Sequence, residues 1–248
     1  MKLARELYSP VILGPKLAEQ LIFLRIDIDQ PINGADLALL DHKLTRPVLC
    51  SNASIPLSRF DPESCNQLVT QFVIASQQLA DFGFRQVVIG ADDDSILQKI
   101  LSPRFNSIGL TLRKMPLLNV FLAVKPIMDD VGVLLTVEEL APGGLDATDG
   151  ISIAQDLEDL GLKTIIATSG TRDFPTLYHR RHTQKKARQE HEFVSNVPEL
   201  AAAKWLLDNT NLAVWGCAFF DEINEAIALA KALGIEGLIE RENKNILN

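Results

Sequence analysis

An acidic run, Asp92, Asp93 and Asp94, follows the apolar segment 86–90 after one further residue, Ala91. Carboxylates at the end of a strand could ligate Mg²⁺ or act as a general base. Because Ser95 follows the run, the same aspartates could instead cap a helix that begins there, and we favour this interpretation. The first interpretation predicts a cluster that faces a ligand, and the second predicts a solvated loop.

Other carboxylates follow or lie in further apolar segments, and they would share one mouth if these segments are parallel strands. They are Asp27, Asp29, Glu138, Glu139 and Glu240. A mouth rich in carboxylates suits a cationic or metal-bound ligand better than an anionic one. The histidines at 179, 182 and 191 meet no fixed zinc pattern, and the three cysteines show no ligand spacing. We therefore expect no metal site, and we expect the cysteines to be reduced thiols.

A basic segment, YHRRHTQKKARQEHE, spans residues 178–192. Its arginines and lysines could bind a phosphate or an acidic partner, or the segment could close over a ligand as a lid. A solvated loop or an exposed helix has the same composition, and we favour that interpretation.

Two smaller features suggest contacts with a ligand. Ser169 and Gly170 follow an apolar segment and could present backbone amides to an anion, although a tight turn also requires glycine. Trp205 and Trp215 lie in apolar surroundings typical of a core. Trp215 could instead stack on a ligand at the end of its strand.

The whole chain has 248 residues, of which 47% are hydrophobic and 23% charged, and its net charge is −8. These values are typical of one globular domain, which we expect to span residues 1–248. The negative charge opposes binding to nucleic acid and to anionic membranes. Charges and prolines interrupt residues 1–16, and no apolar stretch is long enough for a transmembrane helix. We therefore expect a cytoplasmic protein without nucleic-acid or membrane partners.

Apolar segments alternate with longer amphipathic stretches, which is typical of parallel strands joined by crossover helices. The strands are expected at 21–27, 47–51, 86–90, 132–137, 164–168, 212–216 and 237–241. The helices are expected at 62–82, 112–126, 149–160, 197–209 and 221–233. The fold class is therefore α/β, a single TIM-type (β/α)8 barrel. A closed barrel needs one more strand, so either it is hidden between Asp27 and Pro47, or the barrel is irregular or lacks one βα unit.

Three stretches carry a resemblance to a known family. Residues 78–106 contain FGFRQVVIGADDDSILQKILSP, residues 131–170 begin VGVLLTVEELAPGG, and residues 212–241 run from LAVWG to GLIER. Together they resemble the old yellow enzyme, or NADH:flavin oxidoreductase, family over most of residues 70–241. The resemblance implies the family's barrel, with FMN and a substrate at the carboxyl ends of the strands.

The same resemblance locates the positions that carry the family's chemistry. Gly90 and Asp93 stand where the family has the His and His or Asn pair that polarises the substrate oxygen. Ser95 replaces a tyrosine that donates a proton. Leu134 replaces the arginine that stabilises negative charge on the reduced flavin. Gly90 has no side chain, an ionised Asp93 would repel developing negative charge, and leucine cannot stabilise charge on the reduced flavin.

The family's phosphate-binding turns are also altered. Trp215 and Glu240 stand where the resemblance places glycines that admit the FMN phosphate, although Gly216 and Arg241 are retained. If FMN binds, the resemblance assigns it to Ser169, Gly170, Gly216 and Arg241. Replacing Trp215 and Glu240 by glycine would then be expected to raise FMN affinity.

These replacements favour a flavin-free, repurposed or accessory homologue that acts as a subunit, scaffold or small-molecule binder. No cofactor is expected in that case. The alternative is an FMN-dependent NAD(P)H oxidoreductase or ene-reductase with an atypical active site. In either case the expected partner is a small molecule at the barrel mouth or another protein, and we expect a homo- or hetero-oligomer.

Overall fold

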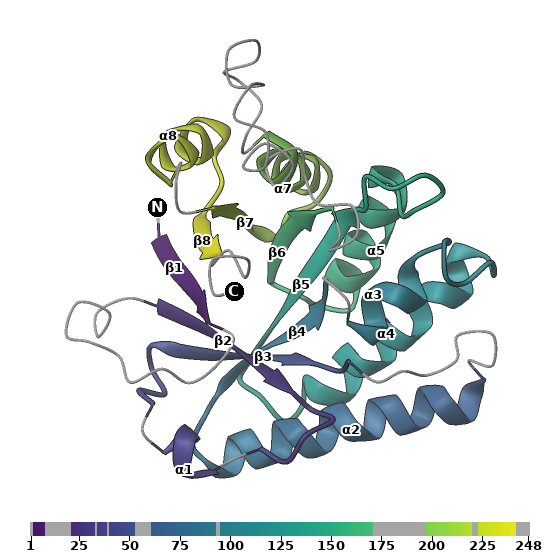
Figure 1. Cartoon of the computed structure of the whole chain (residues 1–248), viewed down its shortest axis with the longest axis vertical. Coiled ribbons are helices and arrows are strands. Elements are labelled where there is room, and N and C mark those ends of the chain that lie inside the picture. Colours follow the sequence, from purple (N-terminus) through teal and green to yellow (C-terminus); the bar gives the residue numbers. More distant parts are fainter. Residues whose placement is uncertain are drawn as a thin grey trace, which may run out of the picture.

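The computed structural model describes residues 2–7, 21–32, 34–38, 40–52, 61–92, 95–170, 197–219 and 223–241. In this part of the chain the strands form a closed parallel barrel in chain order (Figure 1). They are β1 (Lys2–Leu7), β2 (Leu21–Asp27), β3 (Thr45–Cys50), β4 (Gln86–Ala91), β5 (Asp130–Glu138), β6 (Thr164–Ser169), β7 (Ala213–Phe219) and β8 (Gly237–Arg241). The expected α/β barrel is confirmed.

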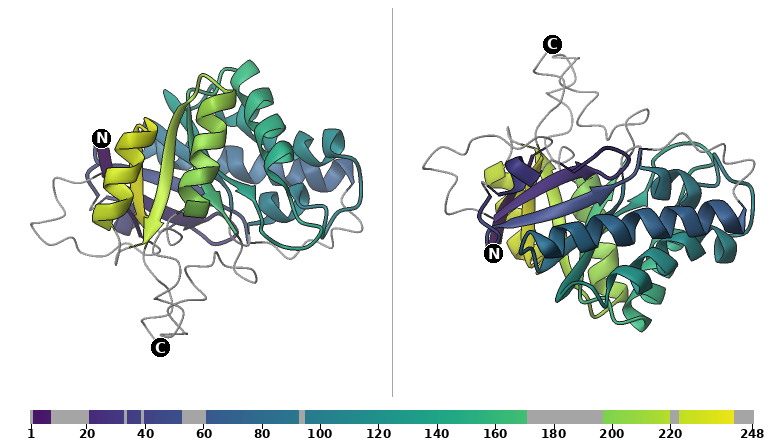
Figure 2. Two further views of the ribbon diagram at one scale, coloured as in Figure 1. Left: turned by 90° about the horizontal axis from the view of Figure 1, so that it is seen from above. Right: turned by 90° about the horizontal axis from the view of Figure 1, so that it is seen from below.

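Helices cover the outside of this barrel (Figure 2). They are α1 (Gly34–Leu37), α2 (Pro62–Asp81), α3 (Ile96–Leu101), α4 (Leu110–Val124), α5 (Ala147–Asp159), α7 (Val197–Asn209) and α8 (Ile223–Leu233). The connection between β2 and β3 carries only the four-residue helix α1 among its described residues, so the barrel is irregular there. No described helix is long and apolar enough to cross a membrane.

The eighth strand is β1, and its position differs from the sequence-based expectation. Residues 2–7 pair in parallel with β2 on one side and with β8 on the other, which closes the ring. The interval between Asp27 and Pro47 contains α1 and the start of β3 instead. The sequence KLAREL hides the strand because three of its six residues are charged, which breaks the apolar run expected of a barrel strand.

Local signals begin and end the helices as the sequence predicted. The Asp61 carboxylate accepts a hydrogen bond from the Ser64 amide at 2.8 Å, so Asp61 caps α2, and Pro62 follows in the first turn. Gly83, Gly161 and Gly234 follow helices α2, α5 and α8 with φ of 94°, 89° and 79°. Glycine adopts this left-handed conformation without the steric cost of a Cβ.

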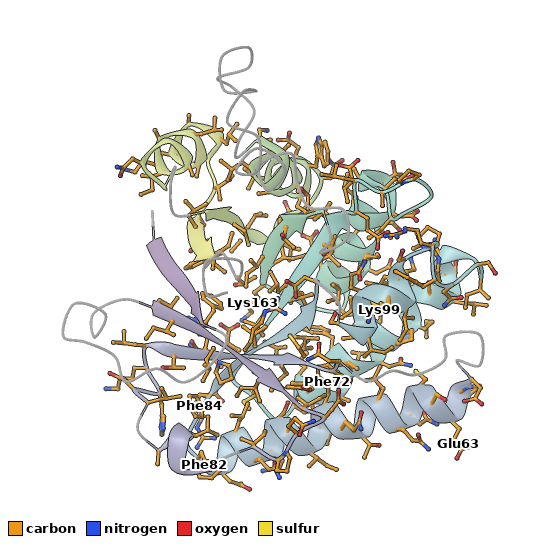
Figure 3. The ribbon with its side chains drawn as sticks, in the orientation of Figure 1. Glu63, Phe72, Phe82, Phe84, Lys99 and Lys163 are labelled. Atoms are coloured by element: carbon orange, nitrogen blue, oxygen red, sulfur yellow. The ribbon has the colours of Figure 1, made fainter. Side chains whose placement is uncertain are left out.

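The core has two layers, one on each side of the strands. The outer layer packs helices on the barrel and includes the fully buried Phe72, Phe84 and Phe121. Figure 3 labels Phe72 and Phe84 between α2 and the strands. The inner layer fills the barrel itself with large apolar side chains, among them Phe23 and Trp215. The barrel is therefore a packed scaffold rather than a channel.

Candidate functional site at the carboxyl ends of the strands

A buried ion pair lies at the carboxyl end of the barrel. The Arg25 guanidinium on β2 donates to the Asp92 carboxylate, which directly follows β4. The Asp92 side chain is fully buried and that of Arg25 is 10% exposed. Arg25 also donates to the Cys50 sulfur on β3 at 3.4 Å. Three neighbouring strands are thus joined where βα barrels carry their functional residues.

Gly90 lies beside the same cysteine. A Cβ placed on Gly90 would lie 2.3 Å from the Cys50 sulfur and 3.2 Å from the Leu49 carbonyl oxygen. The first distance is shorter than side-chain packing tolerates, and the second is a tight contact. The cysteine therefore occupies the space that a side chain at position 90 would need.

Of the acidic run, the structure describes Asp92, whose side chain is buried and paired rather than solvated. Asp92 pairs with Arg25, whereas Asp93 and Asp94 lie outside the described residues. Ser95 itself caps α3, and its hydroxyl accepts a hydrogen bond from the Gln98 backbone amide at 3.2 Å. Ser95 is fully buried. Within the described ranges, no group of three or more His, Cys, Asp or Glu side chains could hold a metal ion.

Two carboxylates, one at the end of β2 and one just after it, bond to the neighbouring loop segments. The Asp29 carboxylate accepts hydrogen bonds from the Ser51 hydroxyl at 3.0 Å and from the Asn52 backbone amide at 2.7 Å. The Asp27 carboxylate accepts a hydrogen bond from the backbone amide of Asp29 at 3.0 Å. These contacts tie the segment after β2 to the segment after β3 at the mouth.

Glu138 and Glu139, adjacent in sequence, have different environments. Glu139 is fully buried. Its carboxylate accepts hydrogen bonds from the side-chain amide of Gln98, from the Ser102 hydroxyl at 2.7 Å and from the Leu145 backbone amide at 2.9 Å. It therefore fixes α3 and the loop after β5. Glu138 is half-buried, and this burial raises its pKa, with a further increase from the nearby negative charge of Asp146.

The other described residues assigned to the site have the following surroundings. Leu134 is 2% exposed and packs inside the barrel. The Gly170 amide donates to the Glu138 carbonyl at 2.7 Å, and its φ of 77° supports the tight-turn interpretation. Ser169 is buried beside it. A Cβ on Gly216 would lie 3.0 Å from Leu200 of α7, so Gly216 faces the helix layer.

Trp215 lies at the opposite end of the barrel from the expected ligand mouth. It is the third residue of β7 and pairs with Gly237, the first residue of β8. Its ring fills the space above that glycine, where a Cβ would lie 2.4 Å from Cδ2. Trp215 therefore cannot block a phosphate at the carboxyl ends of the strands. The side chains of Glu240 and Arg241, and all of segment 178–192, lie outside the described residues.

No family model matches the chain, and no curated protein sequence matches it. Solved structures do match. Morphinone reductase aligns with a TM-score of 0.67 and 12% identity over 97% of this chain. The old yellow enzyme from Trypanosoma cruzi aligns with a TM-score of 0.64 and 11% identity over 90% of this chain. The fold is that of the old yellow enzymes. The identity is low, so the comparison shows the fold alone.

The lengths of these old yellow enzyme-like barrels differ from that of the present chain. The alignment covers 81% of morphinone reductase and 76% of the Trypanosoma cruzi protein. Histamine dehydrogenase from Rhizobium sp. 4-9 has a TM-score of 0.68, but the chain spans only 43% of it. For 2-naphthoyl-CoA reductase the share is 42%. The chain thus spans less than half of these two longer proteins.

Proposed function

We propose that this chain is a flavin-free old yellow enzyme-like barrel, repurposed as an accessory subunit or a small-molecule binder. One observation carries the proposal: the described positions assigned to flavin chemistry serve the barrel itself. Gly90 packs on Cys50, Leu134 fills the interior, and Ser95 caps α3 while fully buried. Gly90 and Leu134 supply no polar side-chain group, and the Ser95 hydroxyl accepts from the Gln98 backbone amide at the start of α3.

The Arg25 and Asp92 pair supports the same proposal. A guanidinium near the barrel axis could stabilise negative charge on a ligand, but this one is bonded to a buried carboxylate. The net local charge is therefore smaller than an isolated arginine would give. The residues present do not fit FMN in the mode that the resemblance implies, so we derive no redox step for this chain.

The alternative is an FMN-dependent oxidoreductase with an atypical active site. It is favoured by the similarity of fold, which extends over 89–97% of this chain for 2-naphthoyl-CoA reductase and morphinone reductase. Barrels of one fold carry many unrelated functions, so the similarity supports this alternative less than the side chains support the proposal.

Absorbance and FMN titration separate the two. Natively purified protein is scanned across the visible range in which flavins absorb, and then titrated with FMN while flavin fluorescence is recorded. A flavin-binding barrel purified in parallel provides the positive control. A colourless protein without saturable quenching at micromolar FMN is expected. A yellow protein, or saturable quenching, would overturn the proposal and favour the oxidoreductase.

A further inference from the structure

Large apolar side chains are exposed on the outer faces of two helices, α2 and α4. Leu112, Met115 and Leu122 on α4 are exposed, and Leu112 is the most exposed of them at 62%. Their spacing of three and seven residues places them on one side of the helix. Ile108, just before α4, and Ile74 on α2 are exposed as well. A contiguous apolar surface of this kind marks a site of interaction.

The helices α2 and α4 lie side by side and form one continuous surface (Figure 1). A hydrogen bond joins the Asn119 side chain on α4 to the Cys65 thiol on α2. In the right-hand view of Figure 2, α2 runs across the front of the molecule. We call the outer faces of these two helices the α2–α4 face.

The α2–α4 face is almost without charge. On α2 no charged residue lies between Glu63 and Asp81. The charged residues within α4 are Arg113 and Lys114, and both pair with carboxylates of α5. The exposed polar residues of α2 between its two charged ends are neutral: Asn66, Gln67, Thr70, Gln71, Gln77 and Gln78. Their side chains both donate and accept hydrogen bonds.

This lack of charge favours a second copy of the same chain as the partner. The chain has a net charge of −8, so two copies repel one another except where a surface is neutral. A two-fold interface brings the same patch of both copies together, so a charged patch would oppose like charges. Neutral amides and hydroxyls complement their own copies. A different protein would be selected by complementary charge, and the α2–α4 face offers none.

We propose that the α2–α4 face is the two-fold symmetric interface of a homodimer. Leu112, Met115 and Leu122 form its apolar centre, and the amide side chains of α2 form its polar rim. An apolar centre within a polar rim is the usual anatomy of a protein interface. The proposal does not depend on the flavin question, because the α2–α4 face belongs to the helix layer outside the barrel.

Sedimentation velocity over a range of protein concentrations tests the interface. The parent chain is expected to pass from monomer to dimer as its concentration rises. Leu112→Glu combined with Met115→Glu should raise the dissociation constant by at least about a hundredfold, because like charges then meet across the interface. Leu140→Glu is the matched control, since Leu140 is also exposed but follows β5, outside both helices. It should dimerise as the parent does.

A mixing experiment tests whether the two copies use the same face. Leu112→Lys combined with Met115→Lys should also be monomeric alone, but an equimolar mixture with the glutamate variant should form dimers. Circular dichroism confirms that each variant is folded. A parent chain that stays monomeric, or a glutamate variant that still dimerises, would overturn the proposal. So would a monomeric Leu140→Glu variant, or a mixture that fails to dimerise.

Discussion

The Arg25 guanidinium on β2 and the Asp92 carboxylate after β4 form a buried ion pair at the carboxyl end of the barrel. The two residues are 67 positions apart in sequence, and β3 lies between their strands. The pair therefore connects strands that share no backbone hydrogen bonds. It lies where a catalytic barrel would expose its reactive groups.

Removing one member of this pair should be costly. Arg25→Met leaves the Asp92 carboxylate buried without the arginine, and a loss of about 3–5 kcal/mol in the free energy of unfolding is expected. The double variant Arg25→Met with Asp92→Asn should be less destabilised than the single variant, because the buried charge is gone. Urea unfolding of both single variants and the double variant gives the coupling. Simple additivity would show that the two side chains do not interact.

Gly90 and Cys50 should be coupled by steric overlap. Gly90→Ala places a Cβ 2.3 Å from the Cys50 sulfur. This overpacking is expected to lower the free energy of unfolding by about 1–3 kcal/mol. Adding Cys50→Ala should recover part of this loss.

Gly132 on the adjacent strand is the matched control for Gly90. Gly132→Ala has room for its Cβ and should be neutral or more stable than the parent by up to about 1 kcal/mol. Thermal unfolding compares the variants. Equal losses for Gly90→Ala and Gly132→Ala would contradict the steric explanation.

Glu138 should make stability fall as pH rises. Because burial and then repulsion by Asp146 raise its pKa above the ordinary 4.5, the folded state holds this proton more tightly than the unfolded state. The contribution of protonated Glu138 to the free energy of unfolding is complete below pH 4.5. It is lost as the pH rises through the raised pKa of the folded state. Glu138→Gln should therefore gain stability relative to the parent between pH 4.5 and neutrality, measured by urea midpoints at each pH.

Asp61 provides a comparison of opposite sign. The hydrogen bond from the Ser64 backbone amide lowers the Asp61 pKa from 3.8. The contribution of the Asp61 carboxylate to the free energy of unfolding is therefore present above that pH and is lost in more acidic solution. Asp61→Asn should thus converge on the parent as pH falls. Parallel pH curves for the parent and the two variants would contradict both assignments.

Trp215 should matter for stability and not for FMN. Trp215→Ala removes a side chain that is 5% exposed inside the barrel, and a loss of about 3–5 kcal/mol is expected. The sequence alone suggested instead that removing this ring, together with Glu240, would admit the FMN phosphate. Flavin fluorescence titration of Trp215→Ala should show no gain in affinity. A gain would mean that the ring acts on the opposite end of the barrel.

Much of the fold could be predicted from sequence because buried parallel strands are continuous apolar runs. The strand β5 and the helix α2 illustrate this, with DVGVLLTVE and an aspartate cap before proline. The strand β1 could not be found, since its charges break that pattern. The apolar pattern also could not show where along a strand a residue lies. It places Trp215 on β7 correctly, but β7 continues to Phe219, so Trp215 lies near the start of the strand.

The candidate site was predictable only where a single position decides the chemistry. Gly90 has no side chain, and that of Leu134 cannot polarise or protonate a substrate in any environment. By contrast, the contacts of Arg25 with Asp92, and of Glu139 with Gln98 and Ser102, join residues separated by 37 to 67 positions. No local pattern signals such pairs. A buried carboxylate and a ligand-facing one look alike in sequence.

The pairing of β1 with β8 has a consequence for biosynthesis. Lys2 is opposite Gly237 and Glu6 is opposite Arg241, so the ring closes between the first and last described strands. On the ribosome, β1 emerges long before its second neighbour has been translated. Until then, the growing sheet has two open edges that could pair with other chains. Prolonged exposure of these edges, and slow closure of the ring once β8 is available, are therefore expected of this barrel.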